Sequence, residues 1–215
     1  IFWIYFSVIA LILFILMSIV HFGLCDWSYL GLKKYKWSVS LTHGLNIVFG
    51  IIFFHTNETF EIFTFLSNLS FNQFQEYLYI VYICYFFLLI RYAYLAIKFT
   101  RLRWGILEMS IILLVIFLTE PLVAFSIYFC FIHTFKHVKS ILKDTSKYLS
   151  NNKFITITTI SFTILTWVGG SLAIIYLHKS FSFDESFIKT LFIGLAALTL
   201  PHMTLVDIFY RRKFN

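Results

Sequence analysis

The sequence predicts an all-α fold, a polytopic bundle of transmembrane helices that forms a single integral membrane domain over residues 1–215. Hydrophobic residues make up 60% of the chain, charged residues make up 13%, and the mean hydropathy is +0.86. A water-soluble protein of this size could not bury so many apolar side chains in its interior. Long apolar runs alternate with short polar stretches, and a run of about 20 apolar residues crosses the hydrocarbon core as a helix.

Seven apolar runs are predicted to form membrane-spanning helices. They cover residues 1–24, 39–55, 77–99, 104–119, 121–138, 154–177 and 187–208. The first run is interpreted as a span and not as a signal peptide, because no basic region precedes it. The runs over 39–55 and 104–119 are short, so their assignment depends on the charges between the runs. Because the sequence starts without methionine, we expect one or more further helices before residue 1.

Basic residues gather in alternate connections. All but three of the 17 Lys and Arg residues lie at or after the ends of the first, third and fifth runs and at the end of the chain; the exceptions are Arg91, Lys179 and Lys189. Positive charge marks the cytoplasmic side, so we expect the N-terminus outside and the C-terminus in the cytoplasm. This topology and attraction to anionic lipids account for the net charge of +7 without a nucleic-acid partner.

Two histidines four residues apart, His133 and His137, lie inside the apolar run over 121–138. On a helix, their imidazoles share one face about one turn apart. Neutral imidazole binds iron, copper and zinc, so the pair could hold one metal ion from the same side. The same spacing would also occur if the two side chains capped carbonyl groups at a helix end or contacted lipid headgroups.

The predicted topology places five of the seven histidines in the cytoplasmic leaflet, on four helices; they are His21, His43, His133, His137 and His202. Polar residues within spans usually face a bundle interior, so a shared metal site is predicted. His21 is favoured as a ligand, whereas His43 is more typical of an interfacial residue. His202 follows Pro201 and could bind metal or the carbonyl group that the proline leaves free. His55 and His178 end their spans on the opposite side.

Two acidic residues lie near this predicted cluster. Asp26 follows His21 and could accept a hydrogen bond from the second nitrogen of an imidazole, or could simply end the helix in the interface. Glu108 could orient a ligand histidine or interact with the positive end of a helix dipole. Both are candidates for holding a metal-binding histidine in place.

Four segments carry sequence motifs that contain these residues. In chain order they are Ser-x-x-His-Phe-Gly-x-x-Asp within residues 16–27, Phe-Phe-His-Thr-Asn-Glu at 53–58, Tyr-Phe-x-x-x-His-x-x-x-His within 121–138, and Pro-His-Met within 197–207. Together they resemble the Brp/Blh-type β-carotene 15,15′-dioxygenases, membrane proteins that supply retinal to microbial rhodopsins. The third segment is the most specific. Two differences are Thr56, where that family usually has proline, and an earlier His-Gly-x-x-Asp motif that has no counterpart here.

The resemblance implies oxidative cleavage of the central double bond of β-carotene by O₂ at a ferrous ion, Fe(2+), to give two retinal molecules. It implies His21, His133 and His137 as catalytic iron ligands and His202 as a fourth ligand or cavity wall. Asp26 and Glu108 would hold the ligand histidines. The resemblance also implies a carotenoid that enters from the lipid bilayer, a functional link to a microbial rhodopsin and a location in the bacterial inner membrane.

The alternative from another class is a membrane transporter or channel whose histidines relay protons. Such relays usually string ionisable groups across the membrane, whereas these histidines are predicted to gather in one leaflet. A two-iron hydroxylase or desaturase would need more than the one His-x-x-x-His cluster in this sequence. A retinal-binding rhodopsin would need a lysine inside the last run, where Lys189 occurs only at the outer end.

Overall fold

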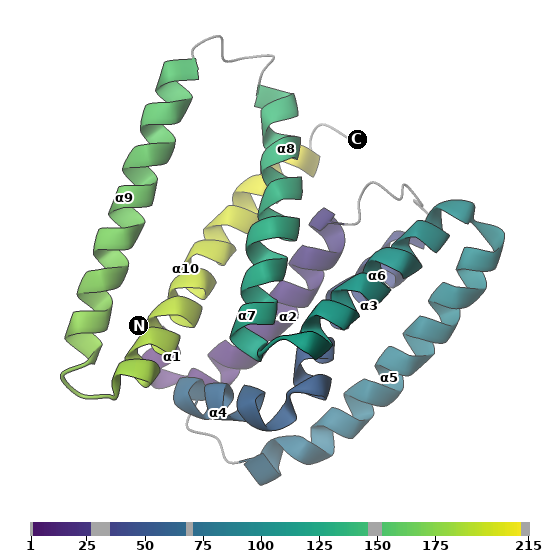
Figure 1. The fold of residues 1–215 in the computed structure, drawn as a ribbon, viewed down its shortest axis with the longest axis horizontal. Helices are drawn as coiled ribbons and strands as arrows, with labels where there is room; N and C mark the ends of the chain where they lie inside the picture. The colour runs from purple at the N-terminus through teal and green to yellow at the C-terminus, as the bar shows by residue number, and fades with distance from the viewer. Residues whose placement is uncertain (1, 27–34, 68–70, 146–151, 212–215) are drawn as a thin grey trace. The chain divides into compact units, whose positions relative to one another are not determined.

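The structure is a computed structural model that describes residues 2–26, 35–67, 71–145 and 152–211. Every regular element in these ranges is a helix, so the predicted all-α class is confirmed (Figure 1). In chain order the helices are α1 (Phe2–Tyr5), α2 (Ser7–Asp26), α3 (Lys36–Phe54), α4 (Thr56–Ser67), α5 (Phe71–Lys98), α6 (Thr100–Leu118), α7 (Pro121–Ile127), the π-helix η3 (Tyr128–His133), α8 (Thr134–Thr145), α9 (Asn152–Leu177) and α10 (Phe183–Arg211).

Six stretches within the described ranges are long and apolar enough to cross a membrane, as in a multi-pass membrane protein. They are Ser7–Asp26, Lys36–Phe54, Leu78–Lys98, Pro121–Lys139, Thr156–Leu177 and Phe183–Thr204. Each corresponds to one of the seven predicted runs. The remaining run, over 104–119, is helical as part of α6, but α6 contains three charged residues, Arg101, Arg103 and Glu108, and is not among the six stretches. The orientation of the chain across the membrane stays a prediction.

Two element boundaries differ from those predicted. The first run is interrupted at Phe6, between α1 and α2. A helix, α4, forms where a connection was expected. Its buried side chains include Phe60, Phe63 and Leu66, spaced three residues apart on one side of the helix. At 12 residues this amphipathic helix is too short to cross a membrane, and a search for long apolar runs therefore misses it.

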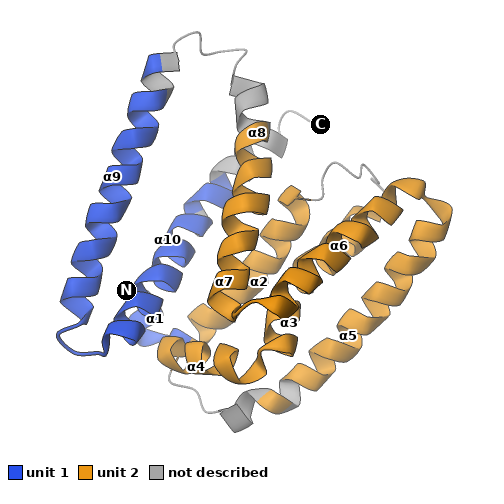
Figure 2. Ribbon diagram, viewed as in Figure 1, with its two compact units in different colours: residues 1–7, 143–215 blue, residues 8–142 orange. Residues whose placement is uncertain are grey.

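The chain divides into two compact units, residues 8–142 and residues 1–7 together with 143–215 (Figure 2). In the first, α3, α5 and α6 pack on one another, and α7 continues into η3 and packs against α3 and α6. In the second, α9 packs against α10. The single domain expected from the sequence stays a prediction.

Helices α2 and α3 cross closely through two glycines. A Cβ atom on Gly44 would lie 1.9 Å from the carbonyl oxygen of Ile19, and one on Gly23 would lie 2.1 Å from that of Ser40. Neither distance leaves room for a methyl group, so each helix presents a glycine to the backbone of the other. Small residues allow such close packing in membrane bundles. The crossing holds the end of α2, which carries His21 and Asp26, against α3.

We expect Gly44→Ala to destabilise the protein by about 1–3 kcal/mol or more, because the added methyl group would force α2 and α3 apart. Unfolding in detergent, followed by circular dichroism against temperature or SDS, measures this change. Gly169→Ala in α9 is the control, since nothing lies within 4 Å of the position that its Cβ would take. A Gly44→Ala protein as stable as the Gly169→Ala protein would contradict the close crossing.

Candidate metal centre

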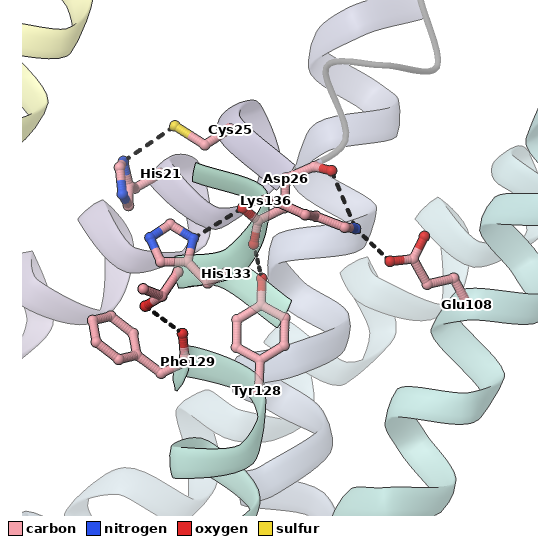
Figure 3. Close-up of polar contacts among 9 residues, drawn as sticks. His21, Cys25, Asp26, Glu108, Tyr128, Phe129, His133 and Lys136 are labelled. Carbon is pink, nitrogen blue, oxygen red and sulfur yellow. Dashed lines mark hydrogen bonds and ion pairs between the residues drawn. The ribbon is translucent and has the colours of Figure 1, made fainter. Parts of the chain in front are cut away.

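The carboxylate of Asp26 lies at the end of α2 and is only 2% exposed. Its Oδ2 accepts a hydrogen bond from the hydroxyl of Tyr128, and its Oδ1 lies 2.9 Å from Nδ1 of His133 (Figure 3). A buried carboxylate is costly unless it is hydrogen-bonded, and these two contacts meet that need. An ionised carboxylate only accepts hydrogen bonds, so Nδ1 of His133 carries the proton. Nε2 is then the nitrogen whose lone pair can bind a metal ion.

The π-helix η3 explains how two residues of one helix reach the same carboxylate. Tyr128 and His133 are five residues apart, which in an α-helix places them about 140° apart around the axis. A π-turn closes hydrogen bonds between residues five apart and brings such residues to the same side. Thr134 completes the wide turn, because both its backbone N–H and its hydroxyl donate to the carbonyl oxygen of Phe129, the hydroxyl at 2.8 Å.

Three of the predicted ligands are neighbours in this unit: His21, His133 and His137. The ring centroids of His21 and His133 are 5.0 Å apart, and those of His133 and His137 are 5.9 Å apart with nearly parallel planes. Two imidazoles bound to one metal ion at about 2.1 Å place their centroids roughly 5 Å apart, so these spacings suit a shared ion. Within the described residues, however, no three or more His, Cys, Asp or Glu side chains already surround one metal position.

The side chain of His21 has a neighbour on its own helix. Its Nδ1 lies 3.5 Å from Sγ of Cys25, one turn further along α2 (Figure 3). This contact engages Nδ1 of His21. The carboxylate of Asp26, which the sequence placed near His21, instead contacts His133.

A lysine between the two histidines of the pair connects three helices. The Nζ of Lys136 forms an ion pair with Glu108 of α6 and lies 3.4 Å from the backbone carbonyl oxygen of Asp26 (Figure 3). Glu108 was predicted to orient a histidine or to interact with the helix dipole. In the structure its carboxylate pairs with Lys136, so it supports the helix that carries His137.

Aromatic rings surround His133. Phe129 stacks on the imidazole at 5.4 Å, and Phe22 meets it edge-on at 5.0 Å. Phe125 in turn stacks on Phe129, so rings at every fourth position from 125 to 137 form one column that ends in the histidine pair. Apolar rings exclude water and strengthen the hydrogen bond between His133 and Asp26.

The other four histidines are His43, His55, His178 and His202. His43 is fully buried, and its Nε2 lies 3.0 Å from the hydroxyl of Tyr92 in α5, so it lies inside the helix bundle, and the interfacial depth favoured for it stays a prediction. Nε2 of His55 donates to the carbonyl oxygen of Ile116 at 2.7 Å and connects the end of α3 to α6. His178 is exposed at the end of α9. His202 lies in α10 of the other unit, so its grouping with the three neighbours stays a prediction.

Sequence reasoning did not assign a role to Tyr128, Cys25 or Lys136. Cys25 is four residues from His21, and this helical spacing could have revealed the contact. Lys136 lies between two candidate ligands, but its partners come from other helices. Tyr128 could not have been paired with His133 from an α-helical pattern, because the π-turn changes the register.

Comparisons with known proteins agree with the motifs. Residues 1–210 match the family described as Beta-carotene 15,15'-dioxygenase. The chain is 29% identical over 209 residues to a Beta-carotene 15,15'-dioxygenase from an uncultured marine bacterium, 66A03, a match that covers 97% of this chain and 75% of the relative. No solved structure matches the chain. Because the family match extends over almost its whole length, this chain belongs to the beta-carotene 15,15'-dioxygenase family.

Proposed function

We propose that this protein cleaves the central 15,15′ double bond of β-carotene with O₂ and releases two retinal molecules. One carbon–carbon double bond breaks, and each of its carbons takes one oxygen atom of O₂ as an aldehyde. Membership of the family supports this reaction. The observation that carries the proposal is the hydrogen bond between Asp26 and Nδ1 of His133, with the rings of His21 and His137 beside it.

The donor set of the site fits a ferrous ion. His21, His133 and His137 would hold it through imidazole nitrogens, and His202 is proposed as a fourth ligand. When bound, iron would supply the redox chemistry that allows triplet O₂ to react with a singlet polyene. The carboxylate of Asp26 prepares the site beforehand, because it keeps the proton of His133 on Nδ1.

The surroundings of the three histidines suit a long apolar substrate. Phe22 and Phe129 contact the ring of His133 and keep water away from it. The helices that carry these residues, α2 and α7–η3, belong to stretches apolar enough to cross a membrane. A carotenoid dissolves in the same hydrocarbon layer, so we propose that it reaches the site from the bilayer.

His133→Ala and His137→Ala should each lower retinal formation by at least about 100-fold, because each removes a nitrogen ligand of the iron. Each variant is expressed in a bacterium that accumulates β-carotene, and retinal in the extracted pigments is measured by chromatography. Iron in the purified proteins is measured in parallel.

His178→Ala is the matched control, since this histidine is exposed at the end of α9. It should retain both retinal formation and iron. Full activity in His133→Ala or His137→Ala would contradict the assignment of these ligands. A wild-type protein that leaves β-carotene intact and binds no iron would favour the transporter alternative.

Asp26→Asn should weaken iron binding by about 10- to 100-fold, because an amide no longer favours the Nδ1-protonated form of His133. Equilibrium dialysis of purified protein against ferrous ion under argon gives the affinity. Glu108→Gln is the comparison, since its carboxylate pairs with Lys136. An equal loss in both variants would mean that Asp26 has no specific part in holding the ligand.

A further inference from the structure

We propose that Tyr128 is a positioning residue for the metal-binding face of His133 and acts through Asp26. This inference deepens the proposed function and rests on it for the role of His133 as a ligand. The hydroxyl of Tyr128 donates to Oδ2 of Asp26, and Nδ1 of His133 lies at Oδ1 (Figure 3). Each carboxylate oxygen therefore has one donor from η3.

The two donors together fix the plane of the carboxylate. The terminal torsion of an aspartate side chain has a broad energy minimum, so one hydrogen bond alone leaves the group free to rotate. A second donor on the other oxygen removes that freedom. The direction from Oδ1 to His133 is then set, and with it the orientation of the imidazole whose Nε2 would face the metal ion.

Burial strengthens this coupling. The exposed fractions are 2% for both Tyr128 and Asp26 and 5% for His133, so water does not compete for the carboxylate. The ring of Tyr128 packs edge-on against Phe22 at 5.2 Å, and the same Phe22 ring contacts His133. Packing against one apolar ring thus helps to hold both donors in place.

The π-turn is the structural cause of this arrangement. In a regular α-helix, Tyr128 would point about 140° away from His133 and could not reach the same carboxylate. The wide turn of η3 aligns the two, and Thr134 stabilises it through the carbonyl oxygen of Phe129. π-Bulges occur frequently at functional sites, and here the bulge has a specific consequence for the hydrogen bonds of a candidate ligand.

The test is Tyr128→Phe in the chain of residues 1–215, which removes one oxygen atom and retains the ring. Apo-protein labelled with ¹⁵N-histidine is studied in detergent micelles by NMR, and His133→Gln identifies the signals of His133. In the wild type, His133 should be protonated at Nδ1, with a downfield proton that reports the bond to Asp26. In Tyr128→Phe this proton should shift upfield, and the affinity for Co²⁺, used as a spectroscopic probe, should fall roughly tenfold.

Tyr85→Phe is the matched control. Its hydroxyl donates to Oδ1 of Asn46 at 2.6 Å in the same unit, so its removal also deletes a hydrogen bond of a tyrosine. It should lower stability without changing the His133 signals or the Co²⁺ spectrum. If Tyr128→Phe does not fold, 3-fluorotyrosine at position 128 retains the hydroxyl and makes it a stronger donor, which should move the His133 resonance in the folded protein.

The outcomes separate this inference from the proposed function. Unchanged His133 signals in Tyr128→Phe, or equal changes in Tyr85→Phe, would overturn the positioning role even if the wild type forms retinal. A His133 signal that responds only to Tyr128→Phe would support the positioning role even if the wild type leaves β-carotene intact. In that case the proposed reaction would be wrong, and the hydrogen bonds would serve another metal site.

Discussion

A single buried carboxylate, that of Asp26, connects the parts of the candidate site. Placing an ionised group where it is only 2% exposed costs free energy that its hydrogen bonds must offset. Two of those hydrogen bonds come from η3, from Tyr128 and His133. The backbone carbonyl oxygen of Asp26 also contacts Lys136 of α8. The carboxylate therefore joins the end of α2 to the helix that carries the histidine pair. Loss of this contact would leave two buried donors unpaired.

Two unusual backbone features, a close helix crossing and a π-turn, help to position Asp26 and its partners. The close crossing of α2 and α3 depends on glycines, since neither Gly23 nor Gly44 has space for a Cβ atom. The helix that carries Tyr128 and His133 contains a π-turn instead of regular α-helix. Glycine in a helix interior costs conformational entropy, and a π-turn is a rare departure from α-helical hydrogen bonding. Such departures are expected where geometry for chemistry competes with stability, and here both position His21, Asp26 and His133.

His43 and Tyr92 form another buried polar contact in the unit over residues 8–142, and its chemistry differs from that of the contacts around Asp26. His43 and Tyr92 meet beside Gly105, where a Cβ atom would lie 2.1 Å from the tyrosine hydroxyl. The hydroxyl also lies 3.3 Å from the carbonyl oxygen of Leu102, so these contacts connect α3, α5 and α6. This pair fastens the scaffold helices together. The group around Asp26 instead brings a carboxylate to an imidazole, which is the combination that prepares a metal ligand.

Composition and local spacing in the sequence determined the all-α class, the positions of the apolar helices and the shared face of His133 and His137. These features depend on residues close together in the chain. Only the tertiary structure decided which imidazole Asp26 holds, because its partners Tyr128 and His133 are 102 and 107 residues away. It also decided the burial of His43 and the pairing of Glu108 with Lys136. Such contacts depend on where helices cross and on the register of a π-turn. The periodicity of apolar residues predicts neither of them.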